Sequence, residues 1–346
     1  MNKKLVAVAV AAGLALPMVS AHAVEVAGKK LEVYGKAHLA VQSNDDSTDS
    51  TDNWEVNSID SRLGFKGAIP LNGGLTATYK YELGIAVADE DDIDTADDST
   101  TVPNKSGITR RNMYLGLKGG FGEVRLGRHD SPLKMAQGKF DQFGDTVGDL
   151  KYAGSQDGEH RNDSSITYLG KFDKIGVNVQ LVPGEGDGTV GSTSGNGIAD
   201  TTSVAVSYTD GPLYVAVAND SYDDTGAAAA TDSGMTRIVA TYKMGNMQFG
   251  LLSQSGVESV TASTDKEDWL GLSFNMKMGN NKLKFQHITV ENDEATKLKG
   301  THTSFGVDHK LGKKGTVYAM YNTLEEKNAT TQTDESQLSV GYILKF

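Results

Sequence analysis

Basic side chains recur at alternate positions in several apolar segments, and the chemistry that they offer is electrostatic. In a β-strand, successive side chains point to opposite faces, so Lys36 would face water while Leu39 faces an apolar medium. The same alternation places Arg62, Lys80 and Arg125 on a polar face. Fixed positive charge that faces water can steer ions and orient dipolar solutes. Strands must therefore hold these side chains on one common surface.

Two long segments between the apolar stretches are acidic. Residues 130–160 mix acidic residues with aromatic ones, and Phe140 and Phe143 predict that this segment is anchored against an apolar surface. Residues 89–98 contain seven acids in ten positions. They lack the central glycine and the ligand spacing of an EF-hand, so we interpret them as a solvated loop and not as a specific calcium site.

Covalent catalysis finds little support in the sequence. The chain has no cysteine, which excludes thiol catalysis and thiol-metal sites. Residues 186–191 fit a dinucleotide-binding pattern, but they lie in an acidic segment with no predicted helix after it. His287 and His309 fall in predicted strands without a serine elbow, so a hydrolase is not expected. We expect no enzymatic activity, no cofactor and no metal site.

The start of the chain has the features of a secretion signal. Lys3 and Lys4 precede an apolar run, and small residues at positions 21 and 23 predict cleavage before Val24. This predicts a signal peptide over residues 1–23 and a single domain over residues 24–346. No other stretch approaches the roughly 20 apolar residues of a membrane helix, so a membrane protein with this sequence would be a β-barrel.

The last strand supports that interpretation. Its apolar residues share one face: Leu338, Val340, Tyr342, Leu344 and Phe346. Ser339 lies on the other face, and Ile343 is the single exception to the alternation. One face of such a strand can meet lipid while the other meets water.

Sixteen segments of about ten residues show the same period of two. They cover residues 31–42, 54–67, 74–86, 107–118, 122–129, 162–170, 174–183, 202–209, 212–220, 234–243, 246–255, 267–277, 282–291, 302–311, 314–323 and 335–346. We therefore predict an all-β fold, a transmembrane antiparallel β-barrel of 16 strands.

The links between these segments alternate in length. Short links such as Met244-Gly245-Asn246 carry turn residues, whereas the links between them are long, acidic and rich in serine, threonine and glycine. Short periplasmic turns and long outer loops are typical of outer-membrane barrels. An even number of strands places both termini on the periplasmic side.

The charge of the chain argues against nucleic acid as a partner. The formal net charge is −12, and loss of Lys3 and Lys4 with the signal peptide takes it to −14. Such a negative protein repels the phosphate backbone.

Five stretches carry a resemblance to a known family: residues 33–37 (Val-Tyr-Gly-Lys-Ala), residues 61–67 (Ser-Arg-Leu-Gly-Phe-Lys-Gly), residues 116–122 (Gly-Leu-Lys-Gly-Gly-Phe-Gly), Leu126-Gly127-Arg128 and the terminal Phe346. In order and spacing the chain resembles the general (non-specific) porins of Gram-negative bacteria. That family consists of trimeric 16-stranded channels in which the third long loop folds into the lumen.

The resemblance implies a channel constriction where basic residues of the barrel wall face acids of loop three. The basic wall would consist of Lys36, Arg62, Lys80, Arg111 and Arg125. Family position sends Arg111 inward, although it shares its parity with the apolar Met113. Gln142 stands where enterobacterial-type porins have a glutamate, so Asp141, Asp145 or Asp149 would supply the constriction acids.

The expected function is passive diffusion of small hydrophilic solutes and ions, with a mild preference for cations. The resemblance also implies a homotrimer in the outer membrane, contact with membrane lipid including lipopolysaccharide, and recognition of Phe346 by the barrel assembly machinery. Two alternatives stay open: a substrate-preferring porin, with an aromatic track or a charged ladder in the lumen, and a barrel that acts as an adhesin or receptor.

Overall fold

The computed structural model describes residues 24–25, 30–46, 53–88, 107–154, 158–184, 197–222, 233–257, 266–292, 299–327 and 332–346. The predicted signal peptide over residues 1–23, the acidic segment 89–98 and the glycine-rich stretch 186–191 lie outside these ranges. Those predictions stay predictions.

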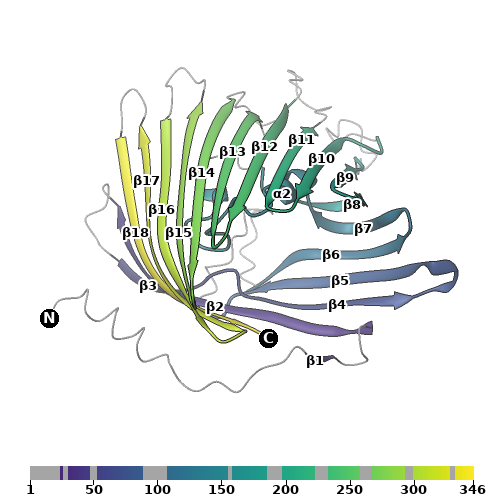
Figure 1. The fold of residues 1–346 in the computed structure, drawn as a ribbon, viewed down its shortest axis with the longest axis horizontal. Helices are drawn as coiled ribbons and strands as arrows, with labels where there is room; N and C mark the ends of the chain where they lie inside the picture. Colours follow the sequence, from purple (N-terminus) through teal and green to yellow (C-terminus); the bar gives the residue numbers. More distant parts are fainter. Residues whose placement is uncertain are drawn as a thin grey trace, which may run out of the picture.

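The described strands form one antiparallel sheet that closes on itself as a barrel (Figure 1). They are β1 (Val24–Glu25), β2 (Glu32–Asp46), β3 (Asn53–Ser58), β4 (Arg62–Pro70), β5 (Thr76–Ile85), β6 (Ile108–Gly119), β7 (Gly122–Asp130), β8 (Arg161–Phe172), β9 (Ile175–Val182), β10 (Thr201–Asp210), β11 (Leu213–Tyr222), β12 (Ser233–Met244), β13 (Met247–Val257), β14 (Glu267–Met278), β15 (Asn281–Asn292), β16 (Lys299–Leu311), β17 (Gly315–Lys327) and β18 (Gln332–Lys345). β18 pairs with β2 in the register Val340↔Val41, and this pairing closes the barrel.

These eighteen strands correspond to sixteen barrel strands. β1 has only two residues, and β3 and β4 pair one after the other with the same strand, β2. The predicted 16-stranded antiparallel barrel is therefore confirmed. One prediction was too simple: the segment 54–67 is not continuous, because residues 59–61 interrupt it between β3 and β4.

Inner and outer faces alternate along the strands, as the period of two predicts. In β14, Trp269 is 2% exposed while its neighbour Leu270 is 61% exposed. In β13, Leu252 is 1% exposed and Leu251 is 56% exposed. The outer surface is therefore apolar and suited to lipid. The last strand follows the rule, since Ser339 is fully buried inside while Ile343 packs inward near Phe143.

Short turns join the strands at one end of the barrel, as predicted. Gly245 and Asn246 connect β12 to β13, and Gly211 and Pro212 connect β10 to β11. Gly211 and Gly245 have φ of 52° and 59°, in the left-handed region that favours glycine. At the opposite end, the links lie largely outside the described residues, with one exception.

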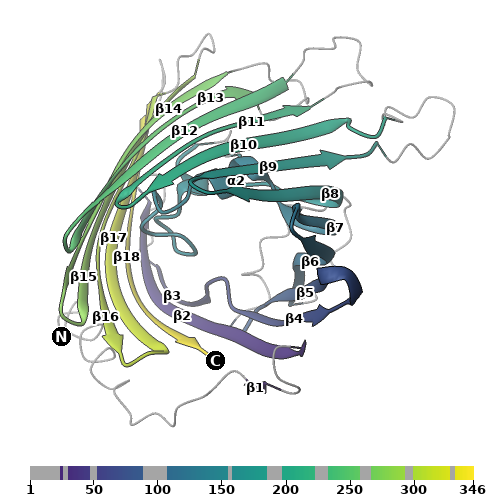
Figure 2. The same cartoon turned by 45° about the vertical axis from the view of Figure 1, so that its right-hand side comes forward.

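That exception is the segment of residues 131–160, which we call loop three. It contains α2 (Pro132–Ala136) and η3 (Leu150–Tyr152), and Figure 2 shows α2 inside the ring of strands. Ser131 Oγ caps α2 by accepting a hydrogen bond from Lys134 N. A further short helix, η2 (Asn72–Gly74), lies in the turn between β4 and β5. None of the described helices is long and apolar enough to cross a membrane.

Loop three is packed against the inner wall by apolar side chains. Phe140 is completely buried, and Phe143 is 1% exposed, which confirms the predicted anchoring. Phe140, Leu150 and Ala153 contact a wall cluster of Val239, Leu252, Trp269, Ile288 and Val290. Full burial of a phenylalanine contributes about 1.5 to 3 kcal/mol, so these contacts hold the loop firmly inside the barrel.

Candidate functional site

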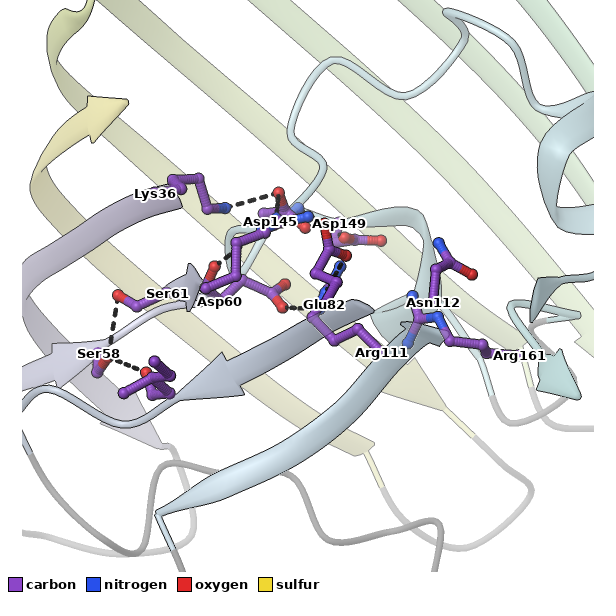
Figure 3. A network of polar contacts seen from close by, with 12 residues as sticks. Lys36, Ser58, Asp60, Ser61, Glu82, Arg111, Asn112, Asp145, Asp149 and Arg161 are labelled. Atoms are coloured by element: carbon purple, nitrogen blue, oxygen red, sulfur yellow. Dashed lines mark hydrogen bonds and ion pairs between the residues drawn. The ribbon is translucent and has the colours of Figure 1, made fainter. Parts of the chain in front are cut away.

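One carboxylate of loop three lies directly on the basic wall. Lys36 Nζ of β2 is 2.7 Å from Asp145 Oδ2, and Arg62 Nη2 of β4 contacts the same oxygen. The structure thus brings together three residues that the sequence proposed separately, of which Figure 3 shows Lys36 and Asp145. Burial by itself raises the pKa of Asp145, but Arg62 and Lys36 outweigh it and hold that pKa well below its usual range. Asp145 is therefore a charged group at neutral pH.

A second carboxylate, that of Glu82, contacts two other basic side chains of the wall. Glu82 Oε2 of β5 lies 3.1 Å from Lys80 Nζ, and Glu82 Oε1 lies 3.0 Å from Arg111 Nε. Tyr34 donates a hydrogen bond to Glu82 Oε2 at 2.8 Å. Glu82 was not among the predicted site residues. It shares the inward parity of Lys80, two residues earlier, and that parity was the available signal.

Arg111 faces inward although its sequence parity indicates the outer face. The register of β5 and β6 shifts between Tyr81↔Met113 and Leu83↔Arg110. One residue of β5, Glu82, is therefore opposite two residues of β6, which is a β-bulge. The extra residue reverses the alternation, so Arg111 reaches the lumen.

Arg125 belongs to a neighbouring group. Its Nε lies 2.8 Å from Glu123 Oε1, its Nη1 lies 2.6 Å from His129 Nε2, and its guanidinium carbon is 4.3 Å from the centre of the Tyr114 ring. Arg125 thus lines the inner wall, as its parity predicts, with these residues as its partners.

The two other predicted loop acids organise loop three. Asp149 accepts hydrogen bonds from Asp145 N at 2.8 Å and from Lys151 N at 3.1 Å. Asp141 accepts one from Phe143 N at 2.7 Å. Burial, and then the nearby Glu159, raise the pKa of Asp149 to about 6, and burial with the nearby Asp149 raises that of Asp141. Asp149 therefore supports the turn that carries Asp145.

Gln142 points toward the wall. Its side-chain oxygen accepts hydrogen bonds from Asn275 Nδ2 at 2.9 Å and from Lys282 Nζ at 3.0 Å, and its backbone N–H donates to Gln286 Oε1 at 2.9 Å. Only 8% of Gln142 is exposed. The position that holds a glutamate in enterobacterial-type porins is here an attachment of loop three to the barrel.

Further charged residues that the sequence did not single out continue the cluster. Arg111 Nη1 lies 2.6 Å from Asp60 Oδ1, in the break between β3 and β4. Arg161 Nε donates to Asp130 Oδ1 at 2.9 Å, and Asn112 Nδ2 donates to Asp130 Oδ2 at 2.6 Å. Figure 3 shows Asp60, Arg111, Asn112 and Arg161 following one another along the inner wall. Within the described ranges, no group of histidine, aspartate and glutamate side chains is arranged to hold a metal ion.

Comparisons with known proteins agree with this architecture. A family model described as Gram-negative porin matches residues 6–329. The major outer membrane protein P.IB of Neisseria gonorrhoeae is 30% identical over 142 residues, which is 40% of this chain and 37% of that protein. The chain thus spans little more than a third of that relative's length. Outer membrane porin protein 32 of Delftia acidovorans is 27% identical over 286 residues, 78% of this chain and 76% of that protein.

Solved porin structures share the fold. The anion-selective porin from Comamonas acidovorans superposes with a TM-score of 0.74 at 21% identity, over 92% of this chain and 99% of that one. OmpT of Vibrio cholerae, solved in a trimer form, has a TM-score of 0.66 at 16% identity, over 92% of this chain and 99% of that one.

Proposed function

The chain belongs to the Gram-negative porin family, and from this premise we propose that it forms a water-filled channel for passive diffusion of small hydrophilic solutes and ions. The family and the closed barrel identify an outer-membrane protein. Porins are channels and not enzymes, so the charged cluster on the inner wall acts on solutes through its field, without covalent chemistry.

The observation that carries the proposal is the position of loop three. It lies inside the barrel and places Asp145 against Lys36 and Arg62 on one side of the lumen. We propose that this region is the constriction and that the bulk of loop three sets the size limit. The basic residues of the constriction are then Lys36, Arg62, Lys80 and Arg111, with Arg125 further along the wall.

We propose that ion selectivity is weak and leans to cations at low salt. Four bases of the cluster face three acids, Asp60, Glu82 and Asp145, so the constriction has little net charge. The whole chain is acidic, at −12, or −14 if Lys3 and Lys4 are removed with a signal peptide. The similar protein from Comamonas acidovorans is described as anion-selective, and that behaviour is the competing outcome here.

We also propose a homotrimer, as in the trimer form of the Vibrio cholerae protein. Contacts with membrane lipid, including lipopolysaccharide, and recognition of Phe346 by the barrel assembly machinery belong to the same proposal. Phe346 pairs with Gly35 on β2, with hydrogen bonds of 3.0 and 3.1 Å between their backbones. This pairing extends the contact between β18 and β2.

One recording in a planar lipid bilayer tests these proposals. Purified, refolded protein should insert with conductance steps in multiples of three, and a salt gradient should give a small reversal potential of the sign for cations. An absence of conductance from correctly folded protein would favour an adhesin or receptor. A saturable block of the ion current by one sugar would favour a substrate-preferring porin. Against that alternative, Phe140 and Phe143 of loop three are buried against the barrel wall and do not form an aromatic track along the lumen.

A further inference from the structure

We propose that Asp60, held in the break between β3 and β4, is an acidic determinant of ion selectivity on the basic wall, and that Ser61 is the residue that positions it. The inference rests on the proposed channel function and assigns part of the selectivity to one wall residue outside loop three.

The break between β3 and β4 has a defined geometry in the barrel wall. β2 pairs with β4 up to Lys36↔Arg62 and resumes with β3 at Leu39↔Ser58. Two residues of β2 therefore face three residues, 59–61, on the other side, which is the arrangement of a β-bulge. Bulges redirect side chains, and this one lies at the height of the lumen where Asp145 meets Lys36.

Ser61 replaces the hydrogen bonds that the strand ladder loses at the break. Its hydroxyl oxygen accepts a hydrogen bond from His38 N at 2.9 Å and donates one to His38 O at 3.1 Å. Ile59 N also donates to His38 O, at 2.9 Å. The backbone N–H and C=O of His38 therefore both have hydrogen-bond partners, although His38 has no regular strand partner at the break. Ser61 is 3% exposed, so no solvent competes for these bonds.

The break gives Asp60 an unusual backbone conformation and a defined direction. Asp60 has φ of 50°, in the left-handed region, where aspartate and asparagine are more tolerated than most residues that carry a Cβ. Its carbonyl oxygen accepts a hydrogen bond from Arg62 Nε at 3.3 Å, and its carboxylate lies 2.6 Å from Arg111 Nη1. The side chain is 22% exposed, so its charge can also act on the lumen.

Asp60 and Asp145 therefore contact the same group of basic side chains, Asp60 from the barrel wall and Asp145 from loop three. Arg62 contacts the carboxylate of Asp145 through Nη2 and the backbone of Asp60 through Nε. Arg111 contacts Asp60 and Glu82. The barrel wall thus supplies some of the negative charge that faces its own basic side chains. The net charge of the constriction therefore depends on Asp60 as well as on the acids of loop three. Figure 3 shows Asp60 between Lys36 and Arg111.

The test is a reversal potential across a salt gradient, measured for the Asp60→Asn channel. Asparagine keeps the tolerance for a left-handed backbone and removes the charge. A unit charge about 7 Å from an ion alters the local concentration of that ion by about threefold at a water-like dielectric constant. Loss of the charge acts on chloride and potassium in opposite directions, so we expect the permeability of chloride relative to potassium to rise about sevenfold. Asp173→Asn is the matched control, because Asp173 is exposed and left-handed, with φ of 53°, but lies in the short turn between β8 and β9.

Charge restoration keeps the test valid if Asp60→Asn folds poorly. The chain has no cysteine, so Asp60→Cys offers a single thiol to an anionic methanethiosulfonate reagent. Modification should return the reversal potential toward the wild-type value, whereas a cationic reagent of similar size should move it further toward anions. Equal effects of the two reagents would contradict a role of the charge.

Ser61 is tested by a pair of variants. Ser61→Ala removes both hydrogen bonds to His38 and should shift the reversal potential in the same direction as Asp60→Asn, by a smaller amount. Ser61→Thr keeps the hydroxyl and should behave as the wild type. If the wild-type protein does not conduct, the proposed function fails. If it conducts and Asp60→Asn leaves the reversal potential unchanged, this inference fails while the channel stands.

Discussion

Arg237 of β12 is completely buried in the inner wall, where it holds the end of loop three. Its Nη1 lies 2.6 Å from Glu159 Oε1 and 3.3 Å from Leu133 O, and its Nε donates to Gln254 Oε1 at 2.6 Å. Glu159 is 6% exposed. A buried ion pair of this kind gives little net stability, but loss of one partner leaves a buried charge uncompensated.

Arg237→Met should therefore destabilise the folded barrel by about 3 kcal/mol, because Glu159 would lose its main counter-charge. The urea midpoint of unfolding, followed by tryptophan fluorescence, would measure the loss. Arg110→Met is the control, since Arg110 pairs with Asp163 at the surface, where the two side chains are 66% and 44% exposed. Such an exposed pair contributes under about 1 kcal/mol. Equal losses for the two variants would contradict the assignment.

The raised pKa of Asp149 predicts that the ion selectivity of the channel changes with pH. Its pKa is raised to about 6, first by burial and then by Glu159, whereas Arg62 and Lys36 hold the pKa of Asp145 low against its burial. Between pH 7.5 and pH 5, Asp149 should gain a proton while Asp145 stays charged. The reversal potential should move toward anions with a midpoint near pH 6.

The linked effect on stability has a definite sign. The pKa of Asp149 is higher in the folded chain than the ordinary aspartate value of 3.8, so folding favours the protonated form. Its stabilising contribution is complete below about pH 4 and is lost as the pH rises through about 6. Asp149→Asn should abolish the pH step in the reversal potential, and Asp145→Asn should preserve it. A step that survives in Asp149→Asn would assign the titration to another group.

Among the described segments, loop three packs against the inside of the barrel wall, and we propose that it narrows the lumen. Deletion of residues 138–148 removes Phe140, Phe143 and Asp145 together, so the single-channel conductance should rise and larger sugars should pass. Removal of the alanines at 227–230, in the link between β11 and β12, is a control deletion that should change neither quantity. A properly folded 138–148 deletion with an unchanged size limit would show that other residues set it.

The faces of β18 predict a difference between two arginine substitutions. Val340→Arg places a charge on the outer, lipid-facing side and should cost roughly 2 to 4 kcal/mol near the bilayer midplane. Gln337→Arg should cost much less, because Gln337 is on the inner face and borders a recess of about 420 Å³. Ser339 is unsuitable as the inner control, since it is fully buried. Refolding yields into lipid vesicles, measured at increasing urea, would compare the two.

The strands could be predicted from the sequence because lipid on one face and water on the other select side chains with a period of two, and every residue of a strand contributes to this pattern. The irregular positions, where the alternation is interrupted, could not be predicted in this way. Arg111 reaches the lumen through a bulge, and Asp60 through a break, and neither changes the composition of its segment. Loop three was recognisable from Phe140 and Phe143, but the choice of Asp145 over Asp149 depends on backbone turns and contacts that only the folded chain defines.

For the molecule as a whole, the net charge predicts how selectivity depends on salt. The Debye length is about 8 Å at 0.15 M ionic strength and about 30 Å at 0.01 M, so charge outside the constriction reaches permeating ions only in dilute solution. The preference for cations should be clear at 10 mM KCl and should fade near 1 M. A strong preference for anions at low salt would contradict the proposed balance of charges.

The pairing of β18 with β2 joins residues that are about 300 positions apart in the chain, as in Val340↔Val41. Contacts this distant in sequence form slowly, because the whole intervening chain must be ordered first. Until β18 is in place, β2 and β17 are two open edges that can pair with other molecules. A partly synthesised chain that lacks β18 therefore cannot close the barrel. The polypeptide has to be kept unfolded and apart from its own copies throughout its transit to the membrane.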